Sequence, residues 1–120
     1  MKASRILLSR EKGSRLPVGA VSVARPHRWG NPFSVERYGR ARAIELFRHA
    51  MEGGWSPDWV AEMVDEEALE VYETMSAFHK RIGMFPAEAA RAELRGLALA
   101  CWCRLNDACH ADALIEIANA

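Results

Sequence analysis

Apolar and polar residues at the start of the chain alternate over short runs, a pattern that is typical of β-strands. The run SRILLSR at residues 4–10 is apolar between polar ends, and the turn-forming EKGS follows it. In PVGAVSVARP, at residues 17–26, Val21 and Val23 fall on one face before Pro26 prevents simple continuation of the strand. The N-terminal part therefore predicts two short strands, the second of which leads into a loop.

From Ser34 onward the apolar period changes to that of a helix. Ser34 suits an N-cap, although the capping box is incomplete. Ile44, Phe47 and Met51 recur at helical spacing. Two glycines at 53–54 then end the run. This pattern predicts one helix that packs on the sheet.

A longer helical pattern covers residues 56–83, where Ser56 before Pro57 suits an N-cap followed by a first-turn proline. Six apolar residues share one face of this predicted helix: Val60, Val64, Val71, Met75, Phe78 and Ile82. Glu67 occupies the remaining position of the stripe. It is either a buried acid with a raised pKa or, as is commoner, an edge residue whose carboxylate reaches solvent.

The C-terminal third of the chain reads as helix, strand and helix. FPAEAARAELRG at residues 85–96 predicts a short helix with Pro86 near its start and Gly96 as its C-terminal cap. LALACWC at residues 97–103 is a continuous apolar run, which predicts a buried strand. NDACHADALIEIANA at residues 106–120 then predicts a terminal helix.

In the last predicted strand, Cys101 and Cys103 would point to one face and Trp102 to the other. The terminal helix would begin with Asp107 as its N-cap. Three of its apolar residues should face inward: Leu114, Ile117 and Ala118. The order of elements predicts a single α/β domain over residues 1–120, with a small open sheet of about three strands packed by helices.

Composition narrows the class of protein without naming a function. Half of the 120 residues are hydrophobic and 27% are charged, as in soluble globular domains. No apolar run approaches the roughly 18 residues of a membrane span, and the signal-peptide pattern is missing, so we expect a cytoplasmic protein with no membrane partner. Three cysteines are an odd number, which argues against a disulfide framework and predicts reduced thiols.

The charges are balanced in number but unevenly placed. Sixteen basic and sixteen acidic residues cancel, yet eleven of the basic ones precede position 50, and the acids gather between positions 52 and 93. This separation predicts either a basic face for phosphate or nucleic acid, opposite an acidic helical face, or two solvated surfaces without such a role.

The loop RPHRWGNPF, at residues 25–33, is dense in residues with special conformational or chemical properties. Six of them suit a nucleotide: Arg25, Arg28, Trp29, Gly30, Asn31 and Phe33. The arginines would hold phosphate, the glycine would let a ligand approach the backbone, and the asparagine would read a base edge or a ribose. One of the aromatic side chains would stack on a base. The alternative is a rigid turn whose aromatic residues fill the core.

The segment CWCRLNDACH, at residues 101–110, holds all three cysteines and one of the four histidines of the chain. Four of its side chains would complete a tetrahedral zinc site, which makes zinc the candidate cofactor: Cys101, Cys103, Cys109 and His110. The spacing is not that of the common zinc motifs, because Cys109 and His110 are adjacent and diverge by about 100° around a helix. A helix N-terminus at Cys109 would also favour the thiolate form of this residue and the binding of an anion. The alternative is that Cys101 and Cys103 are small buried hydrophobes of a core strand.

Both unusual loops follow predicted strands. If those strands are parallel, the loops emerge at the same carboxyl edge of the sheet, which is where open α/β sheets bind ligands. The sequence therefore predicts one site that is formed by both loops.

Three blocks of the sequence match a known family. ARPHRWGNPF near the start, and LRGLALACWC and CHADALIEIAN near the end, resemble the family called domain of unknown function 4326, over about residues 21–119. The resemblance implies a short cytosolic protein from bacteria or their phages with no assigned activity. It sets the motif positions at Arg25, Trp29, Gly30, Asn31, Pro32, Phe33, Cys101, Trp102, Cys103, Cys109, His110 and Asp112. Family members commonly carry lysine where this chain has Leu97, so the chain lacks any charge that this lysine brings to the site.

The leading hypothesis is an enzyme that acts on a nucleotide or nucleic-acid component. Its candidate catalytic residues are Cys109, His110 and Asp112, with Cys109 or His110 as nucleophile or as acid and base. The second hypothesis is a non-catalytic module that binds a nucleotide or a host protein, and the third is a domain stabilised by structural zinc. Trp55 or Trp59 would mark a homodimer surface if exposed, with core packing as the alternative. The chain has no Walker loop, GxGxxG or zinc-deaminase pattern, which argues against those three enzyme classes.

Overall fold

The computed structural model describes residues 5–9, 13, 15–25, 27–52, 65–83 and 85–120. Its three-stranded sheet contains β1 (Arg5–Leu7), β2 (Ala20–Ser22) and β3 (Ala98–Cys101). The described residues also form five helices: α1 (Val35–Tyr38), α2 (Arg40–Glu52), α4 (Asp65–Ile82), α5 (Pro86–Leu94) and α6 (His110–Ala118). The predicted α/β class and the small three-stranded sheet are confirmed.

The strand that comes last in the sequence lies in the middle of the sheet. The order is β1-β3-β2, and both pairings are parallel. Leu99 of β3 lies opposite Arg5 on one side and Val21 on the other. Leu99 and Ala100 are fully buried, which explains why this strand is a continuous apolar run. Because all three strands run in one direction, the loops after β2 and β3 leave the sheet at the same edge.

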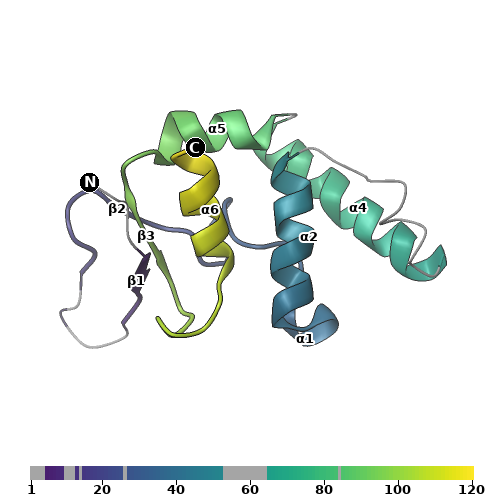
Figure 1. Cartoon of the computed structure of the whole chain (residues 1–120), viewed down its shortest axis with the longest axis horizontal. Coiled ribbons are helices and arrows are strands. Elements are labelled where there is room, and N and C mark those ends of the chain that lie inside the picture. The colour runs from purple at the N-terminus through teal and green to yellow at the C-terminus, as the bar shows by residue number, and fades with distance from the viewer. Residues whose placement is uncertain (1–4, 10–12, 14, 26, 53–64, 84) are drawn as a thin grey trace.

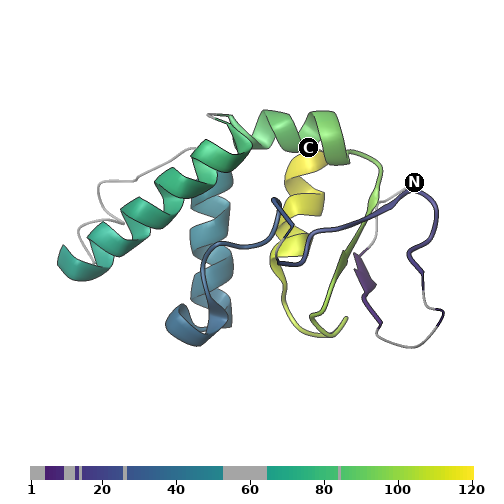
Figure 2. The ribbon, with the colours of Figure 1, turned by 180° about the vertical axis from the view of Figure 1, so that it is seen from behind.

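The helices form layers beside the sheet. α6 contacts both β3 and α2, and it stands between them (Figure 1). α5 packs across one end of α6, and the view from behind shows α4 extending beyond α2, away from the sheet (Figure 2). The core gathers between these layers around Trp29, Phe33, Phe47 and Phe78, each of which is at most 1% exposed. The predicted inward residues of the terminal helix are buried: Leu114, Ile117 and Ala118.

The helix predicted from Ser34 is divided into two. Ser34 is the N-cap of α1, since its Oγ accepts a hydrogen bond from the backbone N–H of Arg37 at 3.3 Å. Gly39 then has a φ of 84°, a left-handed conformation that stops the α-helical ladder after one turn. A second helix, α2, starts at Arg40. The prediction of one continuous helix was therefore wrong at this glycine.

The long helix is present as α4, and its apolar stripe faces the core. Val71, Met75 and Phe78 are buried as predicted. Glu67 lies at the edge of the stripe, where its carboxylate is 3.3 Å from a guanidinium nitrogen of Arg42. The edge interpretation of this glutamate is therefore correct. Several predictions fall outside the described residues: the N-cap at Ser56 and Pro57, the positions Val60 and Val64, the stop at 53–54, and the dimer surface at Trp55 or Trp59.

Two boundaries near the C-terminus differ from the prediction. β3 ends at Cys101, so Trp102 and Cys103 lie in the bend beyond the strand rather than inside it. The N-cap of α6 is Cys109 rather than Asp107. The reason is a capping box, in which the Asp112 carboxylate accepts from the backbone N–H of Cys109 at 3.3 Å.

Part of the uneven charge distribution is neutralised by ion pairs between regions of the chain. Three ion pairs connect arginines of the basic N-terminal part to acids of the middle region: Arg28 with Glu93, Arg37 with Glu70, and Arg42 with Glu67. These arginines therefore do not form an open basic face. Within the described part of the chain, no helix combines the length and apolarity that a bilayer crossing requires.

Candidate functional site

A cavity of about 360 Å³ opens at the carboxyl edge of the sheet, where the loops after β2 and β3 meet. Both loops line it, and the start of α2 adds a further side chain. The lining residues that matter below are Arg25, Asn31, Arg40, Cys103, Cys109 and His110. The expected convergence of the two loops on one hollow is therefore present in the structure.

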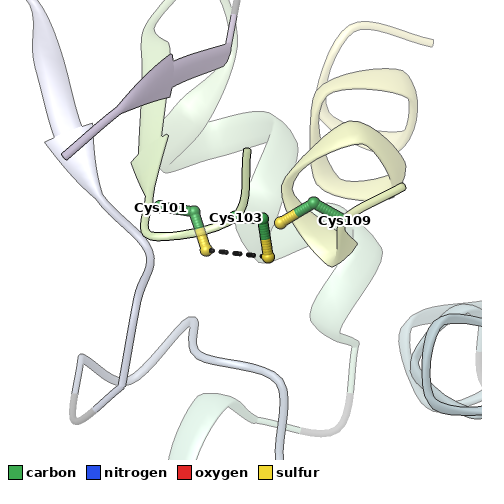
Figure 3. Close-up of side chains that lie close together, drawn as sticks. All are labelled: Cys101, Cys103 and Cys109. Atoms are coloured by element: carbon green, nitrogen blue, oxygen red, sulfur yellow. Dashed lines mark hydrogen bonds between the residues drawn. The ribbon is translucent and has the colours of Figure 1, made fainter. Parts of the chain in front are cut away.

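Three thiols meet at the wall of this cavity (Figure 3). Cys101 is the last residue of β3, Cys103 lies in the bend after it, and Cys109 is the N-cap of α6. Their sulfur atoms lie within 4.8 Å of one another, and the Sγ atoms of Cys101 and Cys103 are 3.8 Å apart. All three thiols are free, with Cys101 and Cys109 buried and Cys103 half-buried. The turn between β3 and α6 thus aims three sulfur atoms at one point.

This arrangement could hold a metal ion. A zinc–sulfur bond is about 2.3 Å long, so two thiolates on one tetrahedral zinc ion stand about 3.8 Å apart. The observed separation of the Cys101 and Cys103 sulfur atoms, 3.8 Å, equals that edge. His110, the fourth predicted ligand, does not belong to the group of atoms that lie within 4.8 Å of one another. Among the described residues, three of the four predicted ligands therefore converge.

His110 makes two contacts that define its role. Its Nε2 lies 2.9 Å from the carbonyl oxygen of Val23, which can only accept, so this nitrogen carries a proton and donates. Its Nδ1 lies 3.7 Å from Cys109 Sγ. In the neutral imidazole, Nδ1 therefore presents its lone pair to the Cys109 thiol. The edge-to-face contact of the ring with Phe47, with centroids 5.2 Å apart, holds this orientation.

The thiols influence one another's ionisation. Hydrogen bonding with the Cys109 thiol lowers the pKa of Cys101 against the effect of burial, and His110 acts in the same direction. The same contact with Cys101, together with burial, raises the pKa of Cys109. Cys101 is therefore the member of this buried pair that ionises first. A divalent cation would replace the remaining protons, because thiolates are its ligands.

Arg40 adds a fixed positive charge beside the thiols. Its Nη1 donates to the carbonyl oxygen of Ala108 at 2.9 Å and to Cys103 Sγ at 3.5 Å. The hydrogen bond to Cys103 is the main cause that raises the pKa of Arg40. Arg40 was not among the predicted site residues, because it lies outside both unusual loops, at the start of α2. Only the packing of α2 against α6 brings it to the cavity.

Arg5, on β1, contacts the segment between Cys103 and Cys109. Its Nη2 donates to the carbonyl oxygens of Leu105 and Asp107, both at 2.8 Å, and its Nε lies 3.2 Å from the Asp112 carboxylate. The Arg5 side chain is only 7% exposed. Asp112, a predicted catalytic residue, therefore accepts from Arg5 and caps Cys109. The structure assigns both of its carboxylate oxygens to holding the loop, and Asp112 does not line the cavity.

In the first loop, the polar atoms of Asn31 are occupied by the protein. Its Nδ2 donates to the carbonyl oxygen of Ala43 at 3.1 Å, and its Oδ1 accepts from the backbone N–H of Phe33 at 2.9 Å. Gly30 is needed for a close approach of backbone to backbone, because a Cβ there would stand 3.0 Å from the carbonyl oxygen of His27. Arg25 stabilises the same turn through its Nε, which donates to the carbonyl oxygen of Asn31 at 2.8 Å. Arg25 is the exposed cation by which this loop faces the cavity.

Two other predicted ligand residues lie away from the cavity lining. Trp29 is 1% exposed, and its Nε1 donates to the carboxylate of Glu93 on α5 at 3.1 Å. Arg28 forms an ion pair with the same carboxylate. For Trp29 and Phe33 the packing alternative describes the structure, because both rings are part of the core. The aromatic residue that lines the cavity with an exposed side chain is Trp102, which is 45% exposed.

The fold and the site together define a small α/β protein with a cysteine-walled cavity at the carboxyl edge of a parallel sheet. The chain belongs to the family described as domain of unknown function 4326 (DUF4326), whose model matches residues 6–120. A search of curated proteins and one of solved structures found no match. Leu97, the position at which the resemblance implied a lysine, precedes β3 and so lies at the strand end opposite the cavity. The missing charge therefore leaves the lining of the cavity unchanged.

Proposed function

We propose that this protein is a zinc-dependent enzyme that acts on a nucleotide or a similar phosphate-bearing small molecule in the cavity at the carboxyl edge of the sheet. The observation that carries the proposal is the convergence of three cysteine sulfur atoms within 4.8 Å at the wall of a hollow that arginines also line. Cys101, Cys103 and Cys109 would bind the metal, and Arg25 and Arg40 would attract the substrate's negative charge.

The number of ligands favours a catalytic zinc over a structural one. Structural zinc sites have four protein ligands, whereas catalytic sites have three and keep the fourth position for water or substrate. Among the described residues, the group that could hold a metal ion contains three cysteines and no fourth side chain. All three cysteines line the cavity, so a ligand in the fourth position would enter from the hollow. A zinc ion bound there would polarise a substrate oxygen or a water molecule.

The lining of the cavity supports a nucleotide-class substrate. Its volume of about 360 Å³ falls in the range of small-molecule sites. Arg25 and Arg40 supply two cations, and the half-exposed Trp102 supplies an aromatic ring for a base. His110 stands next to Cys109 in the same wall. Its Nε2 is engaged by Val23, so its Nδ1 would act as the base that accepts the Cys109 thiol proton when the metal binds, in keeping with its predicted acid and base role.

A second candidate function rests on the contact between Cys109 Sγ and His110 Nδ1, 3.7 Å apart. Without a metal, this pair is a thiol next to an imidazole lone pair, which is the arrangement of a cysteine nucleophile and its base. The protein would then be a thiol enzyme for the same substrate class. The two candidates differ in what Cys109 does, because a metal ligand is not free to attack a substrate.

Native mass spectrometry of the purified protein separates these candidates. We expect one zinc ion per chain that is lost on acid denaturation. Cys103→Ser should lose the metal, whereas His110→Gln should keep it, because His110 lies outside the group of three ligands. Circular dichroism on the same samples reports the fold. Loss of zinc together with unfolding of Cys103→Ser would make the metal structural, and a metal-free wild-type protein would overturn the zinc centre.

Turnover is tested on the zinc-loaded protein with a panel of nucleoside mono-, di- and triphosphates, with nucleosides as the uncharged controls. Phosphorus NMR and mass spectrometry would follow the substrates. We expect a product from at least one phosphorylated compound, and no product with folded Cys103→Ser. Saturable binding without any product would instead identify a binding module. If the protein is metal-free and His110→Gln abolishes rapid alkylation of Cys109 by iodoacetamide, the thiol enzyme is the better description.

A further inference from the structure

Two arginines from distant parts of the chain meet on one turn at the edge of the cavity. Arg25 follows β2, and its Nε donates to the carbonyl oxygen of Asn31 at 2.8 Å. Arg81 lies in the last turn of α4, and its Nη2 donates to the carbonyl oxygen of Gly30 at 3.1 Å. These two carbonyl groups are consecutive in the chain. Side chains from two different parts of the chain therefore donate to the same turn.

Within the described residues, neither of these charges is balanced by a carboxylate. Other arginines of the protein do form ion pairs with acids: Arg5, Arg28, Arg37, Arg42 and Arg48. Arg25 and Arg81 have backbone carbonyl groups as their partners instead. Burial lowers the pKa of Arg81, and the neighbouring positive charge of Arg25 lowers it further. The two cations repel each other, and a bound anion would relieve that repulsion.

The two guanidinium groups are also fixed in position. The Arg81 group lies over the ring of Phe78, with its Cζ 5.4 Å from the centroid. Each group uses one of its five N–H donors on the turn, which leaves its remaining donors available to a ligand. Paired, planar forks of donors match the geometry of phosphate oxygens.

We infer that Arg25 and Arg81 form a phosphate subsite at the edge of the cavity. Arg25 belongs to both the subsite and the cavity lining, so a ligand with its phosphate on this pair extends into the hollow. Arg81 thereby takes the phosphate-binding role that the sequence suggested for Arg28, whose charge is used by Glu93. This inference rests on the proposed function for its substrate, which is a phosphate monoester or diphosphate rather than an uncharged nucleoside.

The test is isothermal titration calorimetry with inorganic pyrophosphate, at one low and fixed salt concentration. Arg81→Gln should weaken binding by about tenfold or more, since it removes a charge-assisted fork. Arg28→Gln is the matched control because it removes the same charge from a neighbouring position, and it should change the affinity by less than about twofold. Equal losses in the two variants, or no binding by the wild-type protein, would overturn the subsite.

Arg25 needs a gentler substitution, because its Nε also supports the turn. Arg25→Lys keeps the charge and loses the fork, so it should weaken pyrophosphate binding by more than Arg28→Gln while the melting curve stays cooperative. An affinity equal to that of the wild-type protein would contradict the role of Arg25. Zinc content is measured on every sample. Pyrophosphate binding without zinc would overturn the proposed enzyme alone, whereas zinc without pyrophosphate binding would overturn this subsite alone.

Discussion

The two loops at the carboxyl edge of the sheet have equally unusual sequences, but their side chains are used differently. In the loop after β2, the amide of Asn31 and the indole N–H of Trp29 both have protein partners. The charge of Arg28 is paired as well. In the loop after β3, the thiol contacts are with one another, with Arg40 and with His110, and a cavity lies in front of them.

This difference shows how to decide whether an unusual loop holds a conformation or binds a ligand. Rare residue types collect where a backbone needs them to hold a difficult turn, and they also collect where a ligand needs them. The partners of the polar atoms distinguish the two cases. Polar atoms that are satisfied by the protein fix a conformation, whereas reactive atoms that converge on a hollow remain available for chemistry. By this criterion the first loop mainly holds a conformation, and the second loop supplies the reactive groups of the site.

Among the tests of this comparison, Trp29→Ala has the largest expected effect. If the first loop is a scaffold, this substitution removes a fully buried ring and should lower the free energy of unfolding by about 3–5 kcal/mol. Trp29→Phe loses the hydrogen bond to Glu93 and a smaller part of the buried ring, so it should cost less, about 1–3 kcal/mol. Urea denaturation followed by circular dichroism measures both values.

The opposite result for Trp29 is equally informative. A Trp29→Ala protein with the stability of the wild type and a large loss of nucleotide affinity would restore the predicted base-stacking role. The comparison between the loops would then fail at its best-buried residue.

A smaller effect is expected from Arg5→Gln, which tests how the second loop is held. Arg5 bridges two carbonyl groups of that loop and the Asp112 carboxylate, so its loss should lower stability by about 2 kcal/mol. Because the same contacts hold the cysteine sulfur atoms together, zinc affinity should fall by about tenfold or more. Competition with a chelating dye measures the affinity.

The matched control for Arg5 lies at the other end of α6. Arg95 also donates to backbone carbonyl groups, those of Ala118 and Ala120. These lie at the C-terminal end of α6, whereas Cys109 is its N-cap. Arg95→Gln should therefore leave the zinc affinity unchanged. An equal fall in both variants would mean that Arg5 acts through general stability rather than by positioning the loop.

Much of the fold could be predicted from periodicity, because the sheet strands and the core faces of the helices are set by burial. The predicted helix boundaries were wrong at two places, where a single residue set the boundary against the pattern of residue types. Gly39 interrupts a helical pattern through its left-handed conformation, which apolar spacing does not reveal. Asp107 is a better N-cap by type than Cys109, yet Asp112 can bond to the backbone N–H of Cys109 and so sets the start of α6 there.

The candidate site was predictable only in part, for a related reason. The cysteines share a short segment, and the parallel strands bring both loops to one edge, so local sequence and topology were sufficient for them. Arg40 and Arg81 come from helices whose placement depends on tertiary packing, and no spacing in the sequence joins them to either loop. Asn31 was assigned to a ligand because its partner, the carbonyl oxygen of Ala43, belongs to such a helix as well.

The smallest expected effect is that of Tyr38→Phe, which tests how firmly the end of the first loop is anchored. The Tyr38 ring packs edge-to-face on Phe33, with centroids 6.0 Å apart, and its hydroxyl donates to Glu70 at 2.8 Å. That hydrogen bond is the first cause that lowers the pKa of Glu70, and Arg37 is the second. Burial, together with Glu70, raises the pKa of Tyr38 to about 12.

In Tyr38→Phe, the pKa of Glu70 should rise towards its ordinary value, which side-chain NMR titration would measure. A lowered pKa contributes stability that is present above the unfolded-state pKa and is lost as the pH falls through the folded-state value. The variant should therefore be slightly less stable than the wild type at pH ~7, and the difference should vanish below pH ~3. Arg37→Gln is the comparison variant, and it should also raise the pKa of Glu70, because it removes both a hydrogen bond and a positive charge. A Glu70 pKa that stays low in Tyr38→Phe would show that the hydroxyl does not anchor this end of the loop, leaving the Phe33 contact as its only support from Tyr38.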